Sequence, residues 1–219
     1  MSQHFVDLLE SLRGRVARMT ALVQDIVEKS VESCINLDPD VARETINCDR
    51  RIDDEEVLVE KQAIDLLALY QPAAGDLRMI TMIIKANSDF ERVADCAVNI
   101  AQRVPLLAKM GDYLVSSDLR LMANTVVDTL RDTIHAFNLN QIDLAKKVLN
   151  SDDVVDALYS QIVQDTLNVL DSEKHRANRD LSTIMIAKNL ERIGDHCTNI
   201  AEDIIYVHSG RIVRHRHAV

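Results

Sequence analysis

The sequence predicts an all-α protein, built as two three-helix bundles that are related by an internal pseudo-twofold repeat. The first observation behind this fold class is the composition. Apolar residues make up 47% of the 219 residues but aromatic residues only 3%, and the chain has 5 Gly, 3 Pro and no Trp. A sheet protein of this length would need more turn residues and would favour aromatic side chains. Long helices need neither.

The second observation is a helical period that runs through most of the chain. In the first segment, apolar residues recur at three- and four-residue steps, as at Leu9, Leu12, Val16 and Met19. This spacing is typical of one face of an amphipathic helix. Segments of this kind predict six long helices, which we expect at about residues 5–37, 39–70, 76–109, 117–138, 142–170 and 179–208.

The residues between these segments have the chemistry of helix ends. Asp38 reads as an N-cap, with Pro39 at the first helical position. We expect Asp76 to cap the third helix, and Pro105 to kink or stop that helix near its end. A cap box at residues 140–143 is expected to open the fifth helix.

Turn residues also mark the middle and the end of the chain. Gly111 and the cluster 116–118 divide it, so the predicted bundles comprise residues 1–112 and 113–219. Residues 171–178 are polar and predict a loop, and Ser209-Gly210 is expected to close the last helix. Short connections make neighbouring helices antiparallel.

The third observation is the repeat itself. Residues 89–102 read DFERVADCAVNIAQ and residues 189–202 read NLERIGDHCTNIAE, with six identities at an offset of 100. Within the second helix of each half, an Asp-x-x-x-Asp pair recurs at an offset of 103. The order of three helices, with the same polar signatures on the second and third, therefore occurs twice.

The polar signatures place carboxylates four residues apart, so both members of a pair stand on one helix face. If the second and third helices pack together, two pairs converge in each half. Hard cations such as Mg²⁺, Mn²⁺, Ca²⁺ or iron prefer such oxygen ligands. The alternative is a solvated face with ordinary salt bridges to Arg92 and Arg192. The duplication gives a functional cation site or polar docking site more weight than one pair alone would, and from the repeat both interpretations stay open. The candidate ligands are Asp49, Asp53, Glu91, Asp95, Asp152, Asp156, Glu191 and Asp195.

Several function classes are disfavoured. A net charge of −10 argues against a nucleic-acid partner. The chain has no phosphate-binding Gly-rich loop, no nucleophile motif and no Glu-x-x-His pair of the ferritin-like type. His196 is the one candidate base beside the acid rows, and a lone helical His is more often structural. The basic tail after Gly210 is expected to be mobile.

The location predicted from the sequence is the cytoplasm. Cys34, Cys48, Cys96 and Cys197 form no Cys-x-x-Cys pair and fall inside helical patterns, so we expect them to be reduced apolar residues. No apolar run approaches the roughly twenty residues of a spanning helix, and the first residues do not resemble a signal peptide.

These motifs together resemble the PhoU family of phosphate-uptake regulators. The resemblance covers essentially the whole chain. It rests on QPAAGDLR at residues 71–78, on both Glu-Arg-x-x-Asp segments, on both Asp-x-x-x-Asp pairs and on the closing segment from Asn199. The resemblance implies two three-helix bundles whose eight acidic residues above bind metal ions, sometimes as iron or zinc clusters. Fe, Zn, Mn and Mg are therefore the expected candidates.

The resemblance also implies a function. Such a protein is expected to be a negative regulator of phosphate uptake and of the phosphate-starvation response. It would be a cytoplasmic homodimer, and an adaptor that links the ATPase of a phosphate ABC transporter to a sensor histidine kinase. Two alternatives remain open from the sequence. One is a metal-dependent hydrolase or phosphatase that uses the carboxylate clusters. The other is a plain helical dimerisation module.

Overall fold

The computed structural model describes residues 3–111, 113–170 and 177–210, and all regular structure in these ranges is helical. The predicted all-α class is confirmed. The helices are α1 (Gln3–Asn36), α2 (Pro39–Tyr70), α3 (Ala74–Ala101), α4 (Val104–Ala108), α5 (Ser117–Leu139), α6 (Ile142–Leu170) and α7 (Ala177–Ser209).

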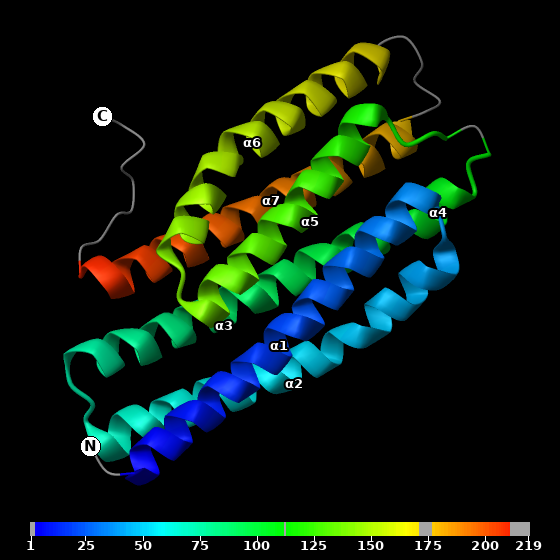
Figure 1. The fold of residues 1–219 in the computed structure, drawn as a ribbon. Coiled ribbons are helices and arrows are strands. Elements are labelled where there is room, and N and C mark those ends of the chain that lie inside the picture. The colour runs from blue at the N-terminus through cyan, green and yellow to red at the C-terminus, as the bar shows by residue number, and fades with distance from the viewer. Residues whose placement is uncertain (1–2, 112, 171–176, 211–219) are drawn as a thin grey trace.

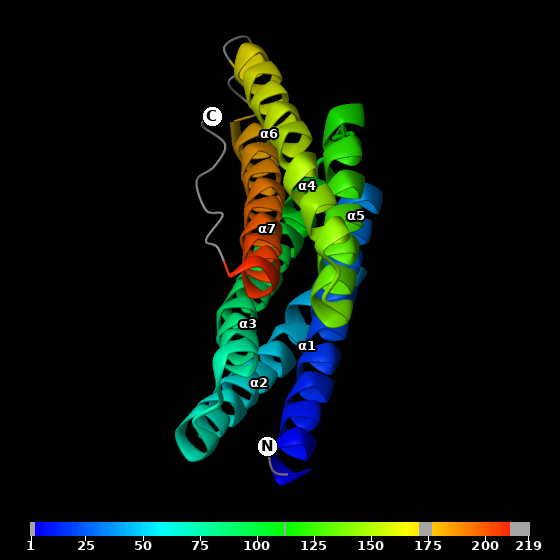
Figure 2. The same cartoon turned by 60° about the vertical axis from the view of Figure 1, so that its left-hand side comes forward.

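The long helices run along one axis and give an elongated molecule (Figures 1 and 2). Helices α1, α3, α5 and α7 form the centre, where α3 packs along α7 and α1 packs on α5. The other two long helices lie on opposite flanks, α2 against α1 and α3, and α6 against α5 and α7. Each half therefore presents one flank helix beside its third helix, as the repeat predicts.

The two halves share one hydrophobic core, and its buried residues come from all the helices. Phe90 of α3 is fully buried, and its ring lies edge-on to that of Phe137 of α5 with centroids 5.4 Å apart. This contact joins the first half to the second. Because the halves share this core, α1–α3 and α5–α7 pack as one body.

The third predicted helix is divided in the structure. Helix α3 ends at Ala101, and Pro105 lies at the start of the short helix α4. A proline removes a backbone donor and clashes with the preceding turn, so the helix cannot continue through it. The predicted cap at Asp76 is wrong, because α3 begins at Ala74 and its N-cap position is Ala73, without a side-chain hydrogen bond. Asp76 lies instead in the first turn, where a carboxylate is favourable.

The α1–α2 and α5–α6 connections have the same backbone turn. Leu37 and Asn140 both have a φ of 53°. The next amides, of Asp38 and Gln141, both donate to a carbonyl five residues back at 2.9 Å. This is a left-handed helix ending. The predicted cap box at 140–143 is therefore wrong, since Asn140 ends α5 rather than capping α6.

The N-cap predicted at Asp38 is confirmed. Its carboxylate accepts hydrogen bonds from the backbone N–H groups of Asp40 and Val41, at 2.9 and 3.2 Å. We expect Asp38→Ala to lower the free energy of unfolding by about 1 kcal/mol, because two N–H groups lose their acceptor. Urea denaturation measures this loss. Asp38→Asn, which keeps a capping oxygen, is the control and should retain most of the stability.

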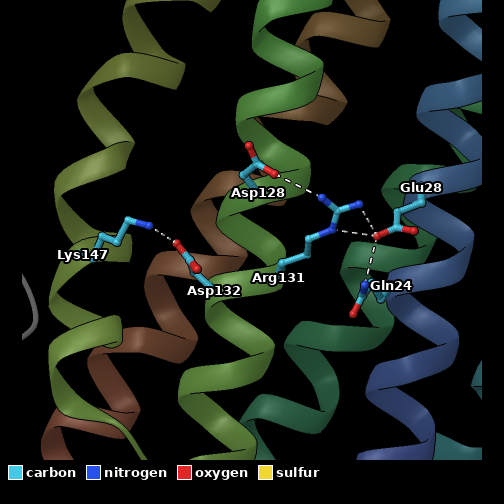
Figure 3. Close-up of polar contacts among 6 residues, drawn as sticks. All are labelled: Gln24, Glu28, Asp128, Arg131, Asp132 and Lys147. Carbon is cyan, nitrogen blue, oxygen red and sulfur yellow. Dashed lines mark hydrogen bonds and ion pairs between the residues drawn. The ribbon is translucent and has the colours of Figure 1, made fainter.

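Ion pairs also link the helices across the molecule. Arg131 of α5 reaches Glu28 of α1 at 2.8 Å and Asp128 of its own helix at 3.2 Å (Figure 3). Lys147 of α6 reaches Asp132 of α5 at 2.7 Å. These side chains are mostly exposed, so each pair stabilises the fold by at most about 1 kcal/mol.

The structure also bears on the predicted end of α7, on the predicted loop before it and on the cysteines. Gly210 has a φ of 65° and its N–H donates to the carbonyl of Tyr206, so it closes α7 as predicted. Residues 177 and 178 of the predicted loop are helical, whereas 171–176 and the tail from 211 lie outside the described residues. The four cysteines form no disulfide, as expected. Within the described ranges, no helix is long and apolar enough to cross a membrane.

Candidate functional site

The carboxylates predicted in the first half lie on the facing sides of α2 and α3. Burial raises the pKa of Asp49, and the charges of Asp53 and Asp95 raise it further. Burial also raises the pKa of Glu91, followed by the charges of Asp95, Glu56 and Asp53. Asp95 of α3 acts on Asp49 of α2, and Asp53 of α2 acts on Glu91 of α3, so carboxylates of the two helices are near enough to repel one another.

Glu56 is a member of this group that the sequence interpretation missed. Burial raises its pKa, and so do the charges of Glu60 and Asp53. The signal was present, because Asp49, Asp53 and Glu56 follow the i, i+4, i+7 spacing of one helix face. Asn87 of α3 holds this part of α2 by donating to the backbone carbonyl of Glu56 at 2.9 Å. We name the repeat-1 cluster as Asp49, Asp53, Glu56, Glu91 and Asp95.

The repeat-1 cluster has little compensating charge. Within the part of the chain that the structure describes, none of its five carboxylates takes part in an ion pair. Arg92 lowers the pKa of Glu91 and Glu56, but it is the last and smallest cause for each. The five carboxylates of the cluster therefore repel one another with little opposing charge.

The cluster in the second half, Asp152, Asp156, Glu191 and Asp195, is different. Lys188 places its ammonium 2.7 and 2.5 Å from the two carboxylate oxygens of Glu191. Burial raises the pKa of Asp195, as do the charges of Glu191 and Asp156, while the charge of Lys188 opposes them. A lysine of the chain itself thus supplies positive charge to this repeat-2 cluster.

Asp152 is the remaining carboxylate of the repeat-2 cluster. It is half-buried on α6, one turn before Asp156. Burial raises the pKa of the Cys197 thiol to about 12, with small contributions from Asp89 and Asp152. Asp152 is therefore near enough to the α6–α7 contact to act electrostatically on this buried thiol.

The repeat relates the two clusters residue by residue and locates their difference. At the offset of 100, Lys188 corresponds to Ser88, and at the offset of 103, Tyr159 corresponds to Glu56. The ammonium of Lys188 also lies 5.3 Å from the centre of the Tyr159 ring, a cation–π contact. The second half has a cation and an aromatic ring where the first half has a hydroxyl and a fifth carboxylate.

The donor chemistry of the repeat-1 cluster suits a hard cation, because carboxylate oxygens are its preferred ligands. The arrangement is not a finished coordination shell. Among the described residues, no three His, Cys, Asp or Glu side chains converge closely enough to hold a metal ion. For the repeat-1 cluster to bind a cation, its side chains would have to rotate toward one another. In the repeat-2 cluster, Lys188 already forms an ion pair with Glu191.

His196 has a structural partner. Its Nδ1 lies 2.9 Å from a carboxylate oxygen of Asp89, and both side chains are largely buried between α3 and α7. At the offset of 100, these two residues correspond to Cys96 and Asn189. The pair therefore joins the two halves, and the ring faces α3 rather than the Glu191 row.

An electrostatic prediction follows from the raised pKa of Asp49. Its ordinary value is 3.8. A carboxyl whose pKa is higher in the folded state stabilises the fold when protonated, and this stability is lost as the pH rises through the raised pKa. We expect Asp49→Asn to raise Tm near pH 7 by about 2 °C, and to weaken the gain in stability on mild acidification.

Thermal unfolding with a chelator present, followed from pH 7 toward pH 4, tests this. Asp54→Asn is the matched control, because Asp54 is exposed on the same helix. An equal gain in both variants would trace the effect to overall net charge rather than to the repeat-1 cluster.

Comparison with known proteins identifies the family. The model of the PhoU domain matches residues 16–104 and 119–204, one match in each half of the chain. The chain belongs to the PhoU family. It is 38% identical over 209 residues, 95% of both chains, to a phosphate-specific transport system accessory protein PhoU homolog of Aquifex aeolicus.

Other PhoU proteins are similar over most or all of their length. The phosphate-specific transport system accessory protein PhoU of Escherichia coli is 28% identical over 98% of this chain and 89% of its own. The crystal structure of PhoU from Pseudomonas aeruginosa superposes with a TM-score of 0.91 at 31% identity, over 94% of this chain and all of that one. The all-helical fold of this chain, with its two PhoU repeats, is therefore also the fold of solved PhoU proteins.

Proposed function

We propose that this protein is a non-enzymatic regulator that acts with a phosphate transport system. The observation that carries the proposal is its likeness, over 95% of both chains, to a protein named as an accessory of phosphate-specific transport. A structure titled a phosphate transport system regulatory protein, from Streptococcus pneumoniae, superposes with a TM-score of 0.88 at 27% identity. The finer role is an adaptor between the transporter ATPase and a sensor histidine kinase in the cytoplasm.

The physical properties of the molecule support a protein-binding role. Its helices are rigid and long, and its net charge of −10 gives an acidic surface that favours a basic patch on a partner. The hydrolase alternative has less support. His196, the one base that the sequence offered, is engaged by Asp89 at 2.9 Å.

Deleting the protein from its host tests this role. We expect phosphate-starvation genes to be expressed in phosphate-rich medium, and the transporter ATPase and the kinase to be captured by the tagged protein. Normal repression of these genes in the deletion strain would contradict the proposed regulatory role. Loss of repression without capture of either partner would contradict only the adaptor role. Turnover of a phosphoester that Asp95→Ala abolishes would favour the enzyme instead.

We also propose that the protein binds a cation. The five carboxylates of the repeat-1 cluster would hold a hard divalent or iron-type ion, which would neutralise their repulsion and stiffen the face of α2 and α3. The residues concerned are Asp49, Asp53, Glu56, Glu91 and Asp95. Calorimetric titration with Mn²⁺ after chelator treatment tests this, and equal heats from the protein and from Asp53→Asn would argue against it.

The homodimer is also a proposal. Helix α2 exposes Val57, Ile64 and Leu69, at 60%, 49% and 74% of their full areas. Exposed apolar side chains gathered on one helix favour a protein partner. Light scattering at several protein concentrations gives the oligomeric state, and Leu69→Glu is expected to shift a dimer toward monomer.

A further inference from the structure

A cavity of about 340 Å³ with several charged side chains in its wall lies where α7 begins, at a site distinct from both carboxylate clusters. Its volume is at the lower end of the range for small-molecule sites. Its wall comes from the segment before α5, from the later part of α6 and from the first turns of α7. The polar residues that decide its chemistry are Tyr113, Asp118, Asp165, Arg179, Asp180 and Thr183.

A buried ion pair forms part of this wall. The side chains of Arg179 and Asp180 are only 14% and 6% exposed, and Arg179 Nε donates to Asp180 Oδ1 at 2.9 Å. The other carboxylate oxygen, Asp180 Oδ2, is buried and has no hydrogen-bond partner. Burying a charge pair costs free energy, and leaving one of its oxygens unsatisfied costs more.

The first half of the chain fills the corresponding position without such a pair. At the offset of 100, Arg179 and Asp180 correspond to Met79 and Ile80 of α3, and Ile80 is fully buried. The same position in the first half is therefore filled by apolar packing, which is the less costly solution. A carboxylate in the first helical turn is favoured by the helix dipole, but the dipole does not require it to be buried.

The cavity has spare acceptors, because the hydroxyl hydrogens of Tyr113, Thr166 and Thr183 are already engaged. Thr183 Oγ1 donates to the carbonyl of Arg179 and therefore accepts from the Tyr113 hydroxyl, at 3.1 Å in each case. Thr166 Oγ1 donates to a backbone carbonyl at 2.6 Å. The carboxylates of Asp118, Asp165 and Asp180 outnumber the single guanidinium. A ligand that fits must donate hydrogen bonds and carry positive charge.

We propose that this cavity binds a primary ammonium group, seated against Asp180. The ammonium would give Asp180 Oδ2 the donor that it lacks and would offset the excess of carboxylates. Two sources share this chemistry, a free diamine and a lysine side chain of a partner protein. Putrescine and Nα-acetyl-lysinamide are the probes that separate them.

Isothermal titration at physiological ionic strength tests the proposal on the full chain. The wild type is expected to bind at least one of the two probes. Asp180→Asn is expected to weaken that binding at least tenfold. Arg179→Met with Asp180→Ile, which installs the residues of the first half, should abolish it and unfold no earlier than the wild type. Asp143→Asn removes a fully exposed carboxylate elsewhere and should leave binding unchanged.

Binding of putrescine alone indicates a free diamine, and binding of the lysine derivative alone indicates a partner side chain. The proposal is overturned if neither probe binds, if Asp180→Asn binds as well as the wild type, or if Asp143→Asn weakens binding equally. A double variant that unfolds well below the wild type would show instead that the ion pair serves the fold.

Discussion

Phe90→Ala is expected to lower the free energy of unfolding by about 3–5 kcal/mol. The Phe90 ring is fully buried and lies edge-on to Phe137 with centroids 5.4 Å apart, so its removal leaves a cavity where the two halves meet. Because the core is shared, we expect one cooperative transition at lower denaturant rather than the early loss of one half.

Urea denaturation followed by circular dichroism measures this change. Leu121→Ala is the control, because Leu121 is 54% exposed on α5 and its truncation should change stability by no more than about 0.5 kcal/mol. Two separate transitions, or a loss below about 1 kcal/mol for Phe90→Ala, would show that the halves fold on independent cores.

Lys188→Ser is expected to lower the free energy of unfolding by about 1–2 kcal/mol near pH 7. The estimate lies between the values for exposed and buried ion pairs, because Lys188 is 46% exposed and Glu191 only 14%. The serine is the residue at the corresponding position of the first half. Without the ammonium, Glu191 is left facing Asp195 and Asp156.

The pH dependence gives this prediction a second readout. Burial and the charge of Glu191 already raise the pKa of Asp195, and Lys188 opposes this rise. Its removal raises the pKa further, so stability is regained as the pH falls and the carboxyl takes up a proton. Lys146→Ser removes a fully solvated pair with Asp143 and should change little at any pH. Equal losses in both variants would mean that Lys188 does no more than a surface lysine.

The fold could be predicted from the sequence because its signals are local. Asp38 and Pro39 set the start of α2, and the three- and four-residue period gives the helix faces. The predicted helix ends were wrong where one residue type suits two positions at a helix end. Asn140 suits an N-cap, but it also tolerates a left-handed backbone, and the preceding helix used it in that way. Asp76 suits a cap, but α3 began two residues earlier.

The candidate site could be predicted in part. The i, i+4 carboxylate pairs follow from helix geometry and duplication. The role of Lys188 does not, because a lysine three residues before Glu191 resembles any surface pair until the depth of Glu191 is known. The partner of His196 was also out of reach, since Asp89 lies 107 residues away in the other half.

Mn²⁺ binding to four proteins tests the central claim, that the repeat-1 cluster is open to a cation and the repeat-2 cluster is closed by Lys188. The wild type is expected to bind in the first half, so Asp53→Asn and Ser88→Lys should each weaken binding at least tenfold. Lys188→Ser should keep this site and gain a second. Wild-type binding that survives both Asp53→Asn and Ser88→Lys, or a Lys188→Ser variant with no added site, would contradict the account.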